Sequence, residues 1–214
     1  MKYLALLSFC VLLLSCEEEP DYYAIPKLLK DWAYFEKGSY WIYQNDSTLL
    51  TDSIFISSIR FQKDSIISDK KLRDIFETII IDYTNSGNGF NYQSKMHGGT
   101  LFFSYTNNTT KIRADCILLR SNINNTIEDS SAYYYISDKY PNLSLNNIIY
   151  NDVIVINTST EYYYFNNSPN DVLYNKYWLS KGNWIIKKVI HTDKGMESWS
   201  LIRKRIIQYS LINP

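Results

Sequence analysis

Histidine and cysteine are the residues of this sequence whose chemistry is easiest to recognise, and the 214 residues contain two histidines and three cysteines. Neither His97 nor His191 has the spacing to a cysteine, an aspartate or the other histidine that a metal site needs. Cys116 lies in an apolar stretch that predicts a strand, where a buried, inert thiol is expected rather than a nucleophile. These residues identify no catalytic group, metal ligand or cofactor-binding residue, so we expect no cofactor. Cys16 is left as the candidate for chemistry.

His97 is followed by Gly98 and Gly99, and this triplet has a faint likeness to the oxyanion loop of esterases. The sequence contains no Gly-x-Ser-x-Gly elbow that would supply the nucleophile of such an enzyme. We therefore interpret the triplet as a hairpin connection, with His97 in the turn and His191 in a later strand.

Cys16 stands at the end of a short apolar run close to the N-terminus. Lys2 precedes the run, residues 3–14 are mostly apolar, and Ser15, Cys16 and three glutamates follow. A positive charge, a short apolar centre and a small residue before the break are typical of a secretory signal peptide. The run is too short for a membrane-spanning helix, which needs roughly 20 apolar residues.

The sequence LLSC at residues 13–16 resembles the lipobox of bacterial lipoproteins. The resemblance implies that residues 1–15 are removed as a signal peptide and that Cys16 carries a diacylglycerol thioether, with palmitate or a similar fatty acid added. Two or more acyl chains give stable anchoring to a membrane. The alternatives are an ordinary secretory signal whose cysteine happens to fall near the cleavage site, or a core helix that stays in the mature fold.

The residues after Cys16 indicate where the anchored protein is expected. Residues 17–21, EEEPD, predict an extended and solvated spacer, so residues 16–24 are interpreted as the lipidated cysteine and an acidic tether. The acidic run also resembles the surface-export signal of lipoproteins in the Bacteroidota. We therefore expect an outer-membrane lipoprotein of the cell envelope, either exposed at the surface or facing the periplasm.

Length and charge limit the remaining possibilities. Removing residues 1–15 from 214 leaves 199, which suits a single domain over residues 25–214. Of the 22 basic residues only Lys2 is lost, so the mature balance is 21 − 22 = −1. This balance gives no electrostatic reason to expect binding to nucleic acid. Because Cys116 is then the one free cysteine, no disulfide can form within the chain.

The body has the composition of β-strands, with frequent tyrosine, isoleucine and threonine and little alanine. All seven glycines fall between apolar segments, which is typical of turns. We expect a short helix at residues 26–32 and strands near residues 39–45, 51–61, 74–83, 90–96, 100–106, 111–119, 131–137, 143–148, 150–157, 161–165, 173–180, 184–191 and 196–208. This pattern predicts a mainly β fold, a single antiparallel meander forming a strongly curved sheet or open half-barrel. A β-sandwich is the alternative.

Two stretches are similar to the opening and the closing hairpin of many small uncharacterised Bacteroidota lipoproteins. They are YFEKGSYWIYQ at residues 34–44 and KGNWIIKK at residues 181–188. The closing hairpin of that family usually has a second glycine two residues after the first, and Trp184 occupies this place here. The resemblance implies a curved sheet and no assigned activity, so no site residue is carried over from it.

The aromatic content is the remaining feature with a functional interpretation, since 20 tyrosines include runs at residues 133–135 and 162–164. Tyrosine forms strands well, and exposed rings can also stack on sugars or line an apolar groove. We expect a lipid-anchored envelope protein, a monomer, that is non-catalytic and binds a small apolar or glycan ligand or an envelope protein partner. The alternative is a surface hydrolase acting on glycans or esters.

Overall fold

The computed structural model describes residues 19–68, 71–85, 90–107, 113–121, 127, 134–163, 172–192 and 195–207. The predicted lipid-attachment residue Cys16 and the predicted signal peptide lie outside these ranges. The elements are β1 (Asp21–Tyr23), α2 (Lys27–Ala33), β2 (Tyr40–Asn45), β3 (Thr51–Ser68), β4 (Lys71–Asn85), β5 (Phe90–His97), β6 (Thr100–Asn107), β7 (Arg113–Arg120), β8 (Tyr134–Leu145), β9 (Ile148–Tyr163), β10 (Val172–Ser180), β11 (Trp184–Thr192) and β12 (Gly195–Arg205).

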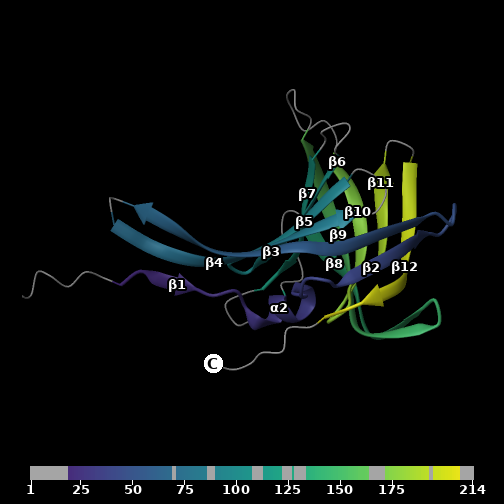
Figure 1. Ribbon diagram of the computed structural model, residues 1–214, viewed down its shortest axis with the longest axis horizontal. Coiled ribbons are helices and arrows are strands. Elements are labelled where there is room, and N and C mark those ends of the chain that lie inside the picture. Colours follow the sequence, from purple (N-terminus) through teal and green to yellow (C-terminus); the bar gives the residue numbers. More distant parts are fainter. Residues whose placement is uncertain are drawn as a thin grey trace, which may run out of the picture.

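The strands form one twelve-stranded sheet in which most neighbours along the chain are also neighbours in the sheet (Figure 1). Strands β2 to β7 pair in succession, strands β8 to β12 do the same, and β12 returns to pair with β2. Each of these ladders is antiparallel. The predicted antiparallel meander is therefore confirmed.

The sheet curls strongly but stays open on the side where β7 approaches β9. Among the described residues, three pairs join these two strands, from Arg113 with Tyr163 to Asp115 with Glu161. The rest of that edge of β9 pairs with β8 instead, and within the described residues no ladder joins β7 to β8. The predicted open half-barrel is confirmed, and the β-sandwich alternative is wrong because all the strands belong to one sheet.

Two of the observed strands run through places where the sequence predicted a break. Residues 131–148 were expected to contain two strands, whereas β8 runs without a break through Pro141. Among the described strands β8 pairs with β9 alone, so it is an edge strand, and an edge position tolerates a proline that cannot donate a hydrogen bond. Its partner β9 likewise replaces the two strands expected at residues 150–157 and 161–165.

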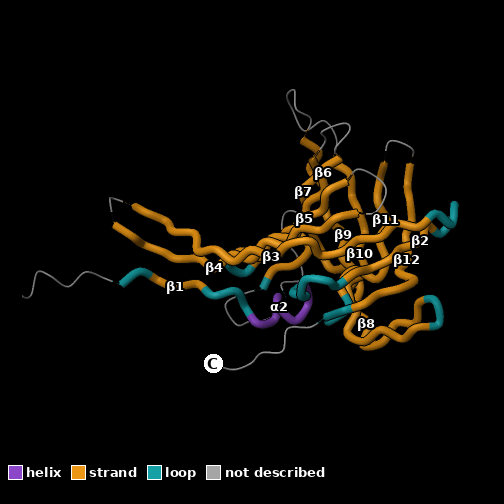
Figure 2. Tube along the Cα trace, viewed as in Figure 1, coloured by secondary structure: helices purple, strands orange, loops and turns teal. Residues whose placement is uncertain are grey.

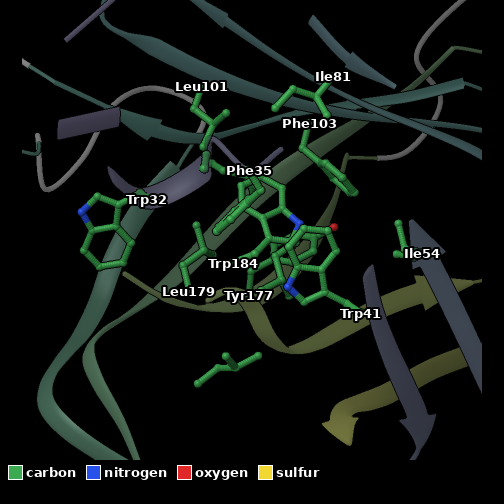
Figure 3. Close-up of a cluster of buried hydrophobic side chains, with 14 of the residues drawn as sticks. Trp32, Phe35, Trp41, Ile54, Ile81, Leu101, Phe103, Tyr177, Leu179 and Trp184 are labelled. Atoms are coloured by element: carbon green, nitrogen blue, oxygen red, sulfur yellow. The ribbon is translucent and has the colours of Figure 1, made fainter. Parts of the chain in front are cut away.

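Aromatic side chains pack against one another inside the curled sheet (Figure 3). The ring centroids of Phe35 and Trp41 are 5.1 Å apart, and Trp184 lies 6.0 Å from Phe103. Phe103 in turn contacts Tyr177 from the opposite wall at 6.4 Å. Large rings contribute most of the apolar area that such a core removes from water. The described rings therefore form a core at the centre of the curl.

The turn before β11 has a tryptophan at the place where a glycine is usual. Trp184 has a φ of 70°, in the left-handed region that favours glycine. Its side chain is 1% exposed and stacks 6.3 Å from Tyr83. The turn thus keeps a glycine-like backbone, and burial of the indole compensates for the strain.

Strands β3 and β4 extend well beyond the curled body and form a projecting arm (Figures 1 and 2). We define the arm as residues 63–68 of β3 and residues 71–77 of β4, which among the described residues pair only with each other and with β1. Strand β1 lies parallel to β4, with Asp21 opposite Asp74. It was not among the predicted strands, since it falls in the segment interpreted as a tether.

Candidate ligand-binding cleft

Helix α2 lies at one end of the curled body (Figure 1). Residues of this helix line one side of a cleft. Pro26 precedes the helix with a φ of −54°, which is preset for entry into a helix. A helix of seven residues is marginal by itself, so its buried face must hold it in place. That face consists of Leu29, Trp32 and Ala33, which belong to the core.

The cleft has a volume of about 750 Å³ and lies between α2, the arm base and the β10–β11 turn. This volume is within the range of small-molecule sites. Its apolar surface comes from Ile25 and Phe35, from Ile79 on β4, and from Phe61, which is 67% exposed and 6.0 Å from the Tyr34 ring. The full lining consists of Ile25, Lys27, Lys30, Asp31, Tyr34, Phe35, Phe61, Ile79, Lys181 and Gly182.

Asp31 holds two lysine side chains together at one edge of the cleft. Its carboxylate accepts hydrogen bonds from Lys27 Nζ at 2.7 and 2.8 Å, and Lys181 Nζ lies 3.8 Å away. The backbone carbonyl of Asp31 also accepts a hydrogen bond of 3.1 Å from the Gly182 N–H. The β10–β11 turn is therefore fastened to the helix, and two ammonium groups are placed around one carboxylate.

Glu77 fastens the other side of the cleft, where β4 meets the N-terminal segment. Its carboxylate accepts hydrogen bonds from the Tyr22 hydroxyl at 2.6 Å and from the Ile25 N–H at 3.0 Å, and Lys30 Nζ is 3.8 Å away. Burial by itself would raise the pKa of this carboxyl. The hydrogen bonds and the charges of Lys30 and Lys63 outweigh burial and hold the pKa of Glu77 below its ordinary value.

A smaller hollow of about 310 Å³ adjoins the cleft and shares Lys30, Phe61 and Ile79 with it. It adds Lys63 and Glu77 to the charged groups of the site. Four lysines and two carboxylates give the joined hollows a balance of 4 − 2 = +2. The whole chain is neutral by formal charge, so the positive balance is local to this site.

The lining of the cleft combines apolar walls with charged groups. The residues that line the larger cleft include no serine, cysteine or histidine. Apolar walls with a few charged groups at the edge suit a ligand that has an apolar body and an anionic group.

His97 lies outside this cleft, at the end of β5 and not in the turn itself. Its Nδ1 is 2.8 Å from the hydroxyl of Thr78, which also donates a 2.7 Å hydrogen bond to Asp64. In a hydrolase triad the imidazole stands between the hydroxyl and the carboxylate. Here the hydroxyl has the middle position, so the arrangement ties β3, β4 and β5 together without activating a nucleophile.

The other residues singled out from the sequence are not brought together by the fold. His191 lies in β11 as expected, and its N–H donates a hydrogen bond of 2.9 Å to Asn175 Oδ1. Cys116 lies in β7 opposite Phe103, and its side chain is outside the described part. Of the tyrosine runs, Tyr135 is 50% exposed on β8, while residues 133 and 164 lie outside the described ranges. Within the described residues, no group of three His, Cys, Asp or Glu side chains could hold a metal ion.

A buried charge pair lies inside the body and was not expected from the sequence. Lys188 and Asp52 have side chains that are 7% and 4% exposed, with Nζ 3.9 Å from Oδ2. The ammonium lies 5.0 Å from the centroid of Tyr43, 5.6 Å from that of Tyr92 and 5.7 Å from that of Trp199. Burial lowers the pKa of Lys188, although Asp52 and Glu197 oppose this shift. The alternation of Ile186, Lys188 and Ile190 along β11 is the signal that could have placed this lysine on the inner face.

Comparison with known proteins adds little to this picture. No family model matches the chain, and no curated protein matches it. A solved structure from Parabacteroides distasonis, of a protein provisionally described as a lipoprotein, is similar over 79% of this chain and 96% of that one. The identity is 8% and the TM-score 0.39, so this likeness carries no argument about function. Among the described residues, no helix is both long and apolar enough to span a bilayer.

Proposed function

We propose that this protein is a lipid-anchored protein of the bacterial cell envelope that binds a small amphipathic anion in the cleft beside α2. The observation that carries the binding role is the apolar cleft of about 750 Å³ whose rim bears Lys27, Lys30 and Lys181. An apolar body would remove Phe61 and the ring of Tyr34 from water, at roughly 25 cal/mol for each Å² buried. An anionic group would lie among the lysines.

The anchor is proposed from the sequence LLSC at residues 13–16 and the acidic run after it. Removal of the signal peptide would leave Cys16 at the N-terminus, carrying its acyl chains in the outer membrane. Because two or more chains hold a protein stably on a bilayer, the body would stay bound while it samples ligands. We propose a monomer that faces either the periplasm or the outside of the cell.

A pair of matched fluorescent probes tests the binding role. 1-Anilinonaphthalene-8-sulfonate is anionic, and N-phenyl-1-naphthylamine has the same rings without the sulfonate. We expect the mature chain with Cys16→Ser to bind the sulfonate probe at one saturable site, and Phe61→Ala to weaken binding of both probes. Lys30→Ala combined with Lys181→Ala should weaken binding of the sulfonate probe roughly tenfold and change the neutral probe little.

The control for these variants is Lys139→Ala, because Lys139 is an exposed lysine on β8 that does not line the cleft. It should leave the binding of both probes unchanged. Binding that does not saturate, or that is indifferent to Phe61 and to both cleft lysines, would remove the reason for assigning a ligand to this cleft.

The hydrolase alternative draws no support from the residues that line the cleft, and it stays a prediction from the sequence. A screen on polysaccharides and esters decides it. A reproducible rate that one carboxylate or serine substitution abolishes would replace the binding proposal with an enzymatic one.

A further inference from the structure

The tip of the arm exposes apolar side chains that the packing of the protein does not use. Ile67 is 69% exposed, Ile66 49% and Leu72 41%. Ile67 and Leu72 are paired across the two strands and so lie on the same face, while Ile66 points to the opposite face. The end of the arm is therefore apolar on both sides, which is unusual for a protruding strand pair in water.

The residues around these side chains suit the boundary between lipid and water. Arg73 is exposed on β4 next to Leu72, and Lys71 precedes it at the start of that strand. Tyr22 and Tyr23 on β1 are 50% and 43% exposed, but they lie opposite Ile75 and Phe76, nearer the body than Leu72. A cationic side chain such as that of Arg73 beside exposed apolar side chains favours the surface of a bilayer that contains anionic lipid.

The direction of β1 points the N-terminal end of the described chain toward this tip. Strand β1 is parallel to β4, and β4 runs from the tip toward the body. Followed from Tyr23 back to Asp21, β1 therefore leads outward along the arm. Asp21 is level with Asp74, and the pair of Ile67 with Leu72 is only two residues farther out. Cys16 is five residues before Asp21, a reach of at most about 17 Å, which extends as far as the tip.

We propose that the tip of the arm enters the membrane interface beside the lipid on Cys16, so that the protein stands on its arm. This inference depends on the lipid anchor of the proposed function and adds a second, protein-borne contact with the bilayer. The seven residues that follow Phe61, from Gln62 to Ser68, would hold the body and its cleft about 23 Å from that contact, at about 3.3 Å per residue.

An environment-sensitive fluorophore on single cysteines tests this orientation. The lipidated protein is reconstituted into vesicles of phosphatidylethanolamine and phosphatidylglycerol, with Cys116→Ser so that the introduced cysteine alone is labelled. A label at Ile67→Cys should become roughly threefold brighter in vesicles and be quenched by spin-labelled lipid. A second tip label, at Leu72→Cys, should behave in the same way.

Met196→Cys is the matched control, because Met196 is 68% exposed, much like Ile67, but lies on the β11–β12 hairpin far from the arm (Figure 1). Its label should stay in water with and without vesicles. Equal spectra for the tip and control labels on a vesicle-bound, lipidated protein would overturn the orientation and leave the anchor intact. A protein without lipid on Cys16, shown by the mass of the purified chain, would overturn both.

A second copy of the chain could also cover the tip, and the same labels recognise that outcome. If Ile67→Cys is already in an apolar environment before vesicles are added, and light scattering gives the mass of a dimer, the arm binds another protein molecule. That result would overturn the membrane contact.

Discussion

Strands β3 and β4 run through both the body and the arm, yet their apolar side chains are buried in one region and exposed in the other. In the body, Ile54 and Ile56 of β3 and Ile79 and Ile81 of β4 alternate with outward residues and are at most 4% exposed. On the arm, Ile67 of β3 is 69% exposed although the antiparallel ladder continues. Alternating apolar side chains form a core only where another part of the curled sheet faces them and covers them. Apolar residues beyond that part of the sheet require another explanation, and we assign them to the membrane.

The largest expected effect comes from removing a ring at the centre of the body. Trp184→Ala should lower the free energy of unfolding by roughly 3–5 kcal/mol, because it leaves a cavity among Phe35, Tyr83 and Phe103. Ile67→Ala, on the arm, should change stability by less than about 0.5 kcal/mol. Urea unfolding followed by tryptophan fluorescence measures both. Similar losses for the two variants would mean that the arm packs against something in solution.

The buried charge pair offers a sharper test inside the body. Asp52→Asn should cost roughly 3 kcal/mol, because it leaves the ammonium of Lys188 buried without its nearest carboxylate. Adding Lys188→Met should recover most of this loss, since a buried ion pair is often no more stabilising than well-packed apolar groups. A double-mutant cycle from chemical unfolding gives the coupling energy. Additive effects would show that the two groups do not sense each other.

Glu77 lies where the arm meets the body, and its substitution should have a smaller effect. Glu77→Gln weakens the hydrogen bonds from Tyr22 and the Ile25 N–H and removes the attraction to Lys30. Because the carboxylate is partly exposed, the loss should be about 1 kcal/mol. Hydrogen exchange should also become faster in β1, which Glu77 holds against β4. Unchanged exchange there would show that the strand pairing alone positions the segment.

The same variant isolates a pH dependence. The pKa of Glu77 is lower in the folded protein than its ordinary value of 4.5, so folding favours the ionised form. The stability that ionised Glu77 contributes is fully present at pH values above 4.5. It is lost as the pH falls through the folded pKa, because Glu77 of the unfolded chain takes up its proton first. The stability difference between the wild type and Glu77→Gln should therefore be constant near neutral pH and shrink below about pH 4.5. A difference that grows in acid would contradict this assignment.

Much of the fold could be predicted from the sequence because it depends on local pattern. Residues 39–45 and 184–191 were expected as strands and correspond closely to β2 and β11. The extension of β3 to Ser68 was missed, since residues 62–68 mix polar and apolar types without alternation. Because a projecting strand pair has no buried face, its sequence need not alternate between apolar and polar residues.

The cleft could not have been predicted in the same way. Its lysines come from residues 27–30, 63 and 181, and only the completed sheet brings them together. The inward position of Lys188 could have been predicted from the sequence, because Lys188 alternates with Ile186 and Ile190 along β11. A lysine beside another lysine is, however, more readily interpreted as exposed. The resemblance of residues 13–16 to a lipobox is local in the sequence and could be recognised. Lipidation of Cys16 itself is tested by experiment.

The central claim is that Cys16 carries lipid and holds a folded body at the membrane. Cells that make this protein are fed radiolabelled palmitate, and the immunoprecipitated chain is compared with Cys16→Ala and Cys116→Ala. We expect label in the wild type and in Cys116→Ala, and loss of label, of processing and of membrane fractionation in Cys16→Ala. A wild-type chain without label, or a Cys16→Ala chain that is processed and fractionates with membranes as before, would contradict the account.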